Sequence, residues 1–461
     1  MRDRGQILAA IAVTVAVVLG GVYLEREVGA RPLEPAPPGQ VPTGAWLCPH
    51  GGGGEWETWI ELANPGTDPV LARVRSLSSG KSSEPEDLEV PPGATVEVPV
   101  AASGRERSTT VEYFGGFVAA GWVAHAAGEE SGVAAEPCLP DTGTRWFLPD
   151  GTTLEKDDDD YVIVMNPYAT DAVISLTLLT ERREPVRTED WTNVTLKPFH
   201  SEAFRLSQKA LGETTVSTLV DVSVGRVAAA TLGVSRAGGI RSAIGLPAAT
   251  GSQVLPGGAD SGRSDLIVMS AGLERVSVSG VILDPEAEQP IAGLADASPA
   301  AESSRTLPST TATPSTLVVT TDAPDVAFAR RTFGVASDQA STTGAVEASD
   351  AWIVLPAVAG SPSHPAIVLA NPGEEPAVVT LRSLPAGDLT PPAPITVEVP
   401  PHRTVGVPRG YVEANGPSAV LAVAESGTFV PAAASYSRGR EGYATYAVTV
   451  GVPIADRWVA P

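Results

Sequence analysis

One short pattern, an apolar run that ends in a turn, recurs along this chain. It occupies residues 59–66, 161–167 and 366–373, and an altered copy occupies residues 265–272. Short apolar runs rich in Val, Ile and Leu that are bounded by turn residues are typical of buried β-strands. Because the copies stand about one hundred residues apart, the pattern indicates a tandem repeat.

An Asn-Pro pair explains why each of these strands ends. The Asn side chain closes a turn on its own backbone, and the Pro fixes φ and lacks the N–H that a sheet needs. We therefore predict structural turns, with a direct contact to a peptide or sugar as the alternative. The predicted turn residues are Asn64 and Pro65, Asn166 and Pro167, and Asn371 and Pro372. In the altered copy Ser270 and Ala271 stand at these positions, so we expect a less restrained turn there.

Composition assigns the chain to the all-β class. The 46 Gly and 42 Pro residues fall mostly between short apolar runs, and only the N-terminus keeps a long apolar stretch. Many short strands with turn signals between them favour β-sandwiches. We predict four tandem immunoglobulin-like β-sandwich repeats. The alternative is a closed β-propeller with two blades per repeat, which would bring the first and last repeats into contact.

The repeats are expected to share one order of strands. Their predicted bounds are residues 45–140, 141–250, 251–344 and 345–461. Late in the first two repeats, paired apolar runs predict β-hairpins over residues 109–124 and 217–234. The third repeat is degenerate, and its Ser/Thr/Pro-rich residues 286–314 predict a long mobile loop that could carry sugar. Trp-x-x-Pro segments at residues 146–149 and 458–461 are expected to pack at the junctions between repeats.

The N-terminus predicts a membrane anchor. Residues 7–24 carry no charge and reach the minimum length for a bilayer span. Arg2 and Arg4 in the cytoplasmic tip, residues 1–6, place the rest of the chain outside the cytoplasm. Residues 25–44 form a proline-rich linker. We favour this uncleaved signal-anchor over the alternative of a cleaved signal peptide.

The two cysteines predict a disulfide. Cys48 and Cys138 bracket the first repeat, and neither belongs to a Cys-x-x-Cys or His-x-x-His pattern typical of zinc ligands. A bond between them would close a loop of about ninety residues and stabilise the repeat by up to about 4–5 kcal/mol. A disulfide requires an oxidising, extracytoplasmic compartment, and two free thiols are the alternative.

Charge and motifs limit the possible functions. The net charge of −23 opposes binding to nucleic acid. Asp157, Asp158, Asp159 and Asp160 are weak candidates for a calcium site, although adjacent side chains point in different directions and a solvated loop is the more ordinary interpretation. The sequence lacks a Gly-x-Ser-x-Gly elbow, a His-Glu-x-x-His motif and a phosphate-binding glycine loop, so we predict neither catalytic residues nor a cofactor.

The anchor, the Trp-x-x-Pro segments, the Asn-Pro strands and Pro-Gly strands such as that at Pro92 together resemble an uncharacterised actinobacterial family of membrane-anchored envelope proteins, a domain of unknown function. The resemblance spans nearly the whole chain and implies no catalytic residue. The sequence therefore predicts a single-pass protein of the cell membrane, mostly extracytoplasmic, that acts as a non-catalytic scaffold binding an envelope protein or glycan. An enzyme of envelope carbohydrate with a site between repeats is the alternative.

Overall fold

The chain divides into two compact units, Met1–Val41 and Pro42–Pro461. The computed structural model describes residues 43–80, 82–154, 158–235, 238–249, 251–257, 263–294, 299–310, 314–334, 338–356, 364–438, 444–455 and 458, all in the second unit. The predicted anchor, residues 7–24, and nearly all of the predicted linker lie outside the described residues. Within those residues no helix has the length and apolar character needed to cross a bilayer.

The regular secondary structure of the described residues is almost entirely β-strand, which confirms the all-β prediction. The first repeat contains β1 (Gly44–Cys48), β2 (Trp56–Asn64), β3 (Val70–Leu77), β4 (Glu86–Val90), β5 (Ala94–Val100), β6 (Ser108–Phe114), β7 (Ala119–Ala126), η1 (Gly128–Glu130) and β8 (Gly132–Pro137). The second contains β9 (Arg145–Leu148), β10 (Asp158–Asn166), β11 (Ala172–Thr180), η2 (Glu189–Trp191), β12 (Val194–Leu196), β13 (His200–Arg205), η3 (Leu206–Gln208), β14 (Val216–Val224), β15 (Ala228–Ser235) and β16 (Gly239–Ile244).

The same succession follows in the second half of the chain. The third repeat contains β17 (Ser252–Gly257), β18 (Arg263–Ser270), β19 (Ser279–Leu283), β20 (Glu288–Pro290), β21 (Ser303–Thr310), β22 (Ser315–Thr320), β23 (Val326–Phe333) and β24 (Gln339–Thr342). The fourth contains β25 (Ala351–Val354), β26 (His364–Asn371), β27 (Ala377–Leu384), β28 (Ile395–Val399), β29 (Arg403–Gly406), α2 (Arg409–Asn415), β30 (Ala419–Ser426), β31 (Val430–Arg438), β32 (Ala444–Val450) and β33 (Val452–Pro453).

Each repeat builds two antiparallel sheets. In the first repeat the strand orders are β1-β6-β3-β4 and β5-β2-β7-β8, and the other repeats follow the same two orders, with β33 added at the edge beside β25. Alternation along β3 buries Val70, Ala72 and Val74 in a core that Ile60 and Leu62 of the facing sheet share. The two sheets of a repeat therefore pack as a sandwich.

Two expectations about pairing need correction. The strands predicted as hairpins lie in different sheets, because β6 pairs with β1 and β3 whereas β7 pairs with β2 and β8, and β14 and β15 are separated in the same way. The strand order also differs from that of an immunoglobulin domain, where the first two strands are neighbours in one sheet. An apolar strand between two turns has the same pattern whether its partner precedes or follows it, so sequence pattern alone does not fix pairing.

The third repeat also differs from expectation. Part of the segment predicted as a mobile loop, residues 286–314, forms β20 and β21, and β21 pairs with β18 along its whole length. β21 lies at the edge of its sheet, and only Ser304 and Leu307 among its described side chains are buried, so the strand needs few apolar residues. Low apolar content therefore led to the wrong prediction for β21.

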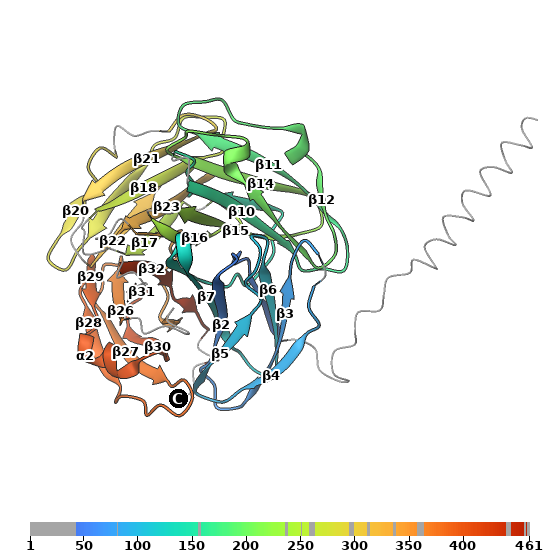
Figure 1. Cartoon of the computed structure of the whole chain (residues 1–461). Coiled ribbons are helices and arrows are strands. Elements are labelled where there is room, and N and C mark those ends of the chain that lie inside the picture. Colours follow the sequence, from blue (N-terminus) through green and yellow to red (C-terminus); the bar gives the residue numbers. More distant parts are fainter. Residues whose placement is uncertain are drawn as a thin grey trace, which may run out of the picture. The chain divides into compact units, whose positions relative to one another are not determined.

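The repeats surround a common axis within the second unit. The last regular strands, β8, β16, β24 and β32, contact one another in the cyclic order β8, β16, β24, β32 and back to β8. Figure 1 shows the colours passing around the unit from blue through green and yellow to orange, which returns beside blue.

A repeated polar contact joins neighbouring repeats. At three junctions a buried hydroxyl on β13, β21 or β29 contacts a hydroxyl near the start of β6, β14 or β22 in the preceding repeat. The pairs are Ser201 with Ser108 (2.7 Å), Ser304 with Ser217 (2.7 Å) and Thr404 with Thr316 (2.9 Å). At the fourth junction Thr95 Oγ1 of β5 donates to Leu384 O (2.6 Å) and accepts from Ala419 N (3.0 Å). The first and fourth repeats are thus in contact, as in the closed alternative and unlike a linear array.

Candidate functional site

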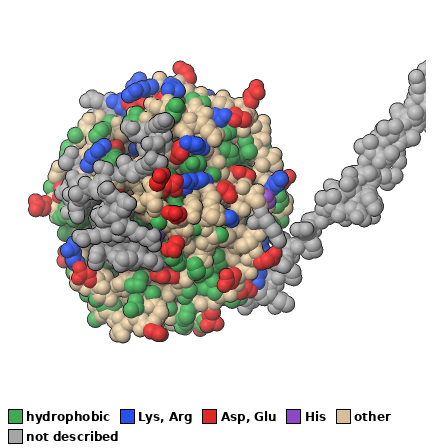
Figure 2. Space-filling view, viewed as in Figure 1, with side chains coloured by type: hydrophobic (Ala, Val, Ile, Leu, Met, Phe, Trp, Pro, Cys, Tyr) green, Lys and Arg blue, Asp and Glu red, His purple; other side chains and the backbone are tan. Residues whose placement is uncertain are grey.

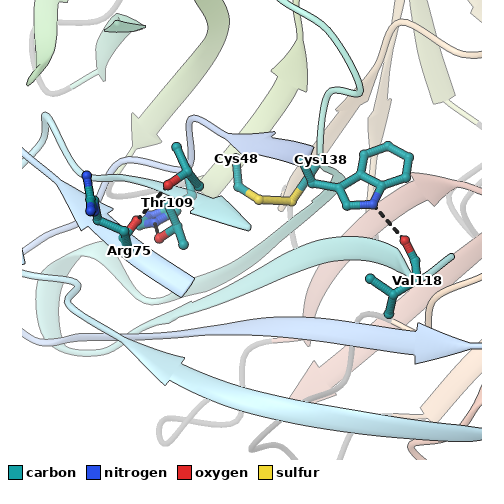
Figure 3. Close-up of a disulfide and its surroundings, with 8 residues drawn as sticks. Cys48, Arg75, Thr109, Val118 and Cys138 are labelled. Carbon is teal, nitrogen blue, oxygen red and sulfur yellow. Dashed lines mark hydrogen bonds between the residues drawn. A yellow bond between two sulfur atoms is a disulfide. The ribbon is translucent and has the colours of Figure 1, made fainter. Parts of the chain in front are cut away.

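The first repeat carries the disulfide. Cys48 and Cys138 are bonded, with a Cα–Cα distance of 4.6 Å and a sequence separation of 90 (Figure 3). The bond joins the end of β1 to the residue that follows β8, beside a β-bridge between Leu47 and Leu139. The second and third repeats have the same bridge without a disulfide, so the covalent bond reinforces a closure that recurs along the chain.

The three Asn-Pro turns have the same geometry. Asn64 Oδ1 accepts from Gly66 N (2.9 Å), and its Nδ2 donates to Asp68 O (2.8 Å) and Val90 O (3.0 Å). Asn166 and Asn371 make corresponding contacts. Each buried amide therefore closes its own turn and also joins it to the end of an edge strand in the other sheet of the same repeat.

Two aspartates of the acidic run have described side chains, and both pair with arginines. Asp159 Oδ1 pairs with Arg205, whereas the buried Asp160 pairs with Arg241 on the opposite face of β10. Asp157 lies outside the described residues, and the side chain of Asp158 is not described. In the part of the chain that is described, no three His, Cys, Asp or Glu side chains are grouped to hold a metal ion.

Asp160 instead belongs to a buried charged cluster between the second and third repeats. Asp150 accepts from Arg331 Nε (3.0 Å), Arg241 Nε (3.2 Å) and Ser341 Oγ (2.5 Å). Asp160 Oδ2 accepts from Arg241 Nη2 (2.5 Å). Burial alone would raise the pKa of Asp150, but the charges of Arg331 and Arg241 lower it to about 2. Burial raises the pKa of Asp160 to about 6. The cluster is enclosed, which suits holding two repeats together better than meeting a ligand.

His50 occupies the position of Asp150 in the first repeat, since each follows a Trp-x-x-Pro segment. Its Nδ1 contacts Gly51 O (2.6 Å) and its Nε2 contacts Thr109 Oγ1 (2.9 Å). Complete burial lowers the pKa of His50 to about 4. This histidine is therefore neutral near pH 7 and is closed off from solvent, so its environment is that of a core residue.

An open groove lies a few residues further along the first repeat. We name it the tryptophan groove, and it has a volume of about 390 Å³. Its lining residues come from the glycine loop before β2, from the start of β2 and from the end of β5 and the loop that follows. They are Gly53, Gly54, Trp56, Glu57, Thr58, Trp59, Pro99, Val100, Ala102 and Ser103.

Glycines allow this loop to approach its neighbours. A Cβ on Gly52 would lie 1.9 Å from Ala102 O, and one on Gly53 would lie 2.4 Å from Trp56 Nε1. Gly53 N donates to Ala102 O (2.8 Å), which fixes the loop against the end of the groove. Only glycine fits at both positions, so the glycine run has a packing role at the groove wall.

Two tryptophans give the groove its chemistry. Trp56 is buried, donates through Nε1 to Glu130 (3.0 Å) and lies under the guanidinium of Arg105 (5.2 Å to the ring centroid). Trp59 is half-buried and meets His125 edge to face (5.6 Å between ring centroids). Trp56 is therefore a fixed wall, whereas Trp59 is available to a ligand.

Polar groups stand beside these rings. Thr58 is 2% exposed and its Oγ1 has no hydrogen-bond partner among the described residues. The exposed Glu57 and Ser103 add a carboxylate and a hydroxyl. Apolar rings with a few polar groups are the usual composition of a small-ligand site. Glu57 is the one carboxylate among these lining residues.

The sequence did not predict this groove. In the sequence, Trp59 belongs to the first apolar run, residues 59–66, and nothing there links it to residues 99–103. The groove forms because β2 and the end of β5, about forty residues apart in sequence, are neighbours in one sheet.

Figure 2 shows acidic and basic side chains interspersed over the described part of one face.

Comparisons with known proteins add a family match. A family model described as a family of unknown function (DUF5719) matches residues 114–352. No curated protein matches the chain. Two solved structures are weakly similar to it. A calcium-stabilised adhesin with which an Antarctic bacterium binds ice is 12% identical (84% of this chain, 94% of that chain, TM-score 0.11). Trypsin-activated α2-macroglobulin from Escherichia coli is 9% identical (88% and 42%, TM-score 0.12). Neither TM-score supports a shared fold.

Proposed function

We propose that this chain, which belongs to the family of unknown function DUF5719, is a non-catalytic binding scaffold of the cell envelope. Residues 7–24 anchor it in the membrane, and the unit from Pro42 to Pro461 stands outside the cytoplasm. Two features support this location. The anchor segment is uncharged, and the disulfide between Cys48 and Cys138 suits an oxidising compartment.

The tryptophan groove is the main support for this proposal. A saccharide ring has apolar C–H faces that pack on an indole and hydroxyls around its edge that need polar partners. Trp59 supplies the indole face, and Glu57 and Ser103 supply the polar partners. The groove is large enough for one or two sugar rings. We therefore propose an envelope glycan as the ligand.

The test is binding of the purified chain to insoluble envelope glycan, measured by co-sedimentation. We expect Glu57→Gln and Trp59→Ala each to weaken binding by about tenfold, which corresponds to about 1.4 kcal/mol. Glu57 is exposed, so its variant should leave folding intact. Tyr168→Ala, at an exposed aromatic residue of the second repeat outside the groove, is the control and should bind normally.

Three results would contradict the proposal. Equal binding by wild type and both groove variants would remove the groove from the interaction. No binding by the wild type would exclude the glycan used. Release of soluble sugar during the incubation would favour the enzymatic alternative over a scaffold.

A further inference from the structure

The four repeats can be compared at one backbone position, the residue just before β5, β13, β21 and β29. The four residues are Gly93 (φ 62°), Phe199 (φ 54°), Glu302 (φ 45°) and His402 (φ 55°). Positive φ is costly for residues other than glycine. Three repeats nevertheless carry a side chain here, so that side chain has a compensating contact.

Each of these three side chains reaches the preceding repeat. The ring of Phe199 lies under the guanidinium of Arg75 (5.0 Å to the centroid). Glu302 pairs with Arg187. His402 Nδ1 lies 3.0 Å from Glu288 Oε2. The position thus supplies a side chain that bridges the junction between two repeats.

The fourth junction, between the fourth and first repeats, differs because Gly93 has no side chain. A Cβ at Gly93 would have no neighbouring atom within 4 Å. A groove of about 550 Å³ lies here, and we name it the seam groove. Figure 1 shows β4 and β5 beside β27 and β30 at this junction. The lining residues are Pro65, Gly66, Thr67, Pro92, Gly93, Arg382, Ser383, Leu384, Pro385, Pro391, Pro392 and Pro394.

Arg382 relates this groove to the junction that Phe199 fills. It stands two residues before the end of β27, as Arg75 stands two residues before the end of β3. Arg382 therefore corresponds to Arg75. At this junction, however, the residue that corresponds to Phe199 is Gly93, which has no ring. Arg382 is the one charged residue among those that line the groove.

We propose that the seam groove binds an extended peptide segment whose aromatic side chain stacks on Arg382. The stacking repeats a contact that the chain already makes between Phe199 and Arg75. The prolines provide a rigid apolar surface that loses little conformational entropy on binding. Pro65 and Gly66 belong to the first Asn-Pro turn, so that turn also borders this site.

The test uses two labelled peptides and fluorescence polarisation with the purified full chain. One probe has a single Phe between two Pro-Pro pairs, and the other has Ala in its place. We expect the Phe probe to bind at least tenfold more tightly than the Ala probe. Arg382→Ala should weaken binding of the Phe probe, whereas Arg75→Ala, at the junction already filled by Phe199, should not.

The chain itself suggests a blocking variant. Gly93→Phe places in the seam groove the residue that the second repeat carries at the same backbone position and similar φ. We expect this variant to remain folded, with a melting temperature no lower than that of the Gly212→Phe variant, and to lose at least tenfold in affinity for the Phe probe. Gly212→Phe is the matched control, since Gly212 also has a positive φ (78°) and open space around a Cβ.

The proposal is overturned if the wild type binds neither peptide, or if it binds the Phe and Ala probes equally. It is also overturned if a folded Gly93→Phe variant binds like the wild type, or if the seam groove is occupied by a second copy, seen as a dimer in sedimentation that Gly93→Phe abolishes.

Discussion

At the scale of single residues, the repeat places different chemistry on equivalent backbone. The position after Trp-x-x-Pro carries His50 in the first repeat and Asp150 in the second, and both side chains are fully buried. His50 satisfies its ring nitrogens locally, whereas Asp150 requires two arginines. Equivalent positions therefore differ in how they respond to pH.

His50 predicts a loss of stability in acid. The pKa of its ring is about 4 in the folded chain and about 6.5 when unfolded. Between these values the unfolded state binds the proton and the folded state does not, so stability is full above pH 6.5 and is lost as pH falls toward 4. Asp160 acts in the opposite direction, because its pKa of about 6 lets the folded state bind a proton first. The wild-type curve is therefore shallow, and a variant is needed to isolate His50.

We expect His50→Gln to remove the part of the acid-dependent loss of stability that comes from protonation of this histidine. The stability difference between wild type and variant should shift by about 2 kcal/mol in favour of the variant between pH 7 and 4.5. Urea unfolding at several pH values measures it. Thr109→Val removes a hydrogen-bond partner of His50 but not its titration, so this control should keep the wild-type pH dependence. Parallel curves for wild type and His50→Gln would contradict the prediction.

At the scale of elements, the sequence indicated strands and turns but not their partners. The apolar runs and the Asn-Pro stops placed β2, β10 and β26 in the chain, and the cysteine pair predicted the disulfide. Pairing depends on residues far apart, so β6 and β7 were wrongly joined as a hairpin. The tryptophan groove was missed for the same reason, because its two walls meet only after β2 pairs with β5.

The charged cluster between the second and third repeats gives a prediction at this scale. Removing one partner of a buried ion pair leaves a buried charge unpaired, so Arg331→Leu should lower the free energy of unfolding by about 3–5 kcal/mol. The junction between the first and second repeats has no ion pair among the described residues at the same positions, and there Leu232 packs beside Gly51. A variant that copies this junction should recover most of the loss.

That variant combines four changes. They are Asp150→His, Asp160→Thr, Arg241→Ala and Arg331→Leu, which copy His50, Thr58, Ala134 and Leu232. The new histidine would meet Thr218, the counterpart of Thr109, whose Oγ1 is buried without a partner among the described residues. Guanidinium unfolding should place this variant within about 2 kcal/mol of wild type. Arg145→Leu, at a more exposed arginine of the same junction, should cost about 1 kcal/mol or less. A fourfold variant as unstable as Arg331→Leu would refute this account.

At the scale of the whole unit, closure brings the two ends of the repeat array together. The ring of Trp458 stacks on Phe117 (6.1 Å between centroids), and Phe117 also meets Trp46 of β1 (6.2 Å). The N-terminal Thr43 of the unit donates through its backbone N to Tyr113 O (2.8 Å). A linear array of four repeats would hold these ends several repeat lengths apart.

Closure therefore predicts that the unit tolerates circular permutation. New ends between the exposed residues Pro140 and Asp141, with a short flexible linker that joins Trp458 to Thr43 in place of the residues beyond them, should preserve every junction and the disulfide. Such permutation succeeds when the original ends are close and the new ends lie in an exposed loop. We expect a monomer whose melting temperature lies within about 5 °C of that of the unpermuted unit, a change worth about 4 kcal/mol for a unit of this length. The linker is too short to span a linear array of four repeats. If the repeats were arranged linearly, the permutant would aggregate, exchange repeats between copies or unfold, and any of these results would contradict the prediction.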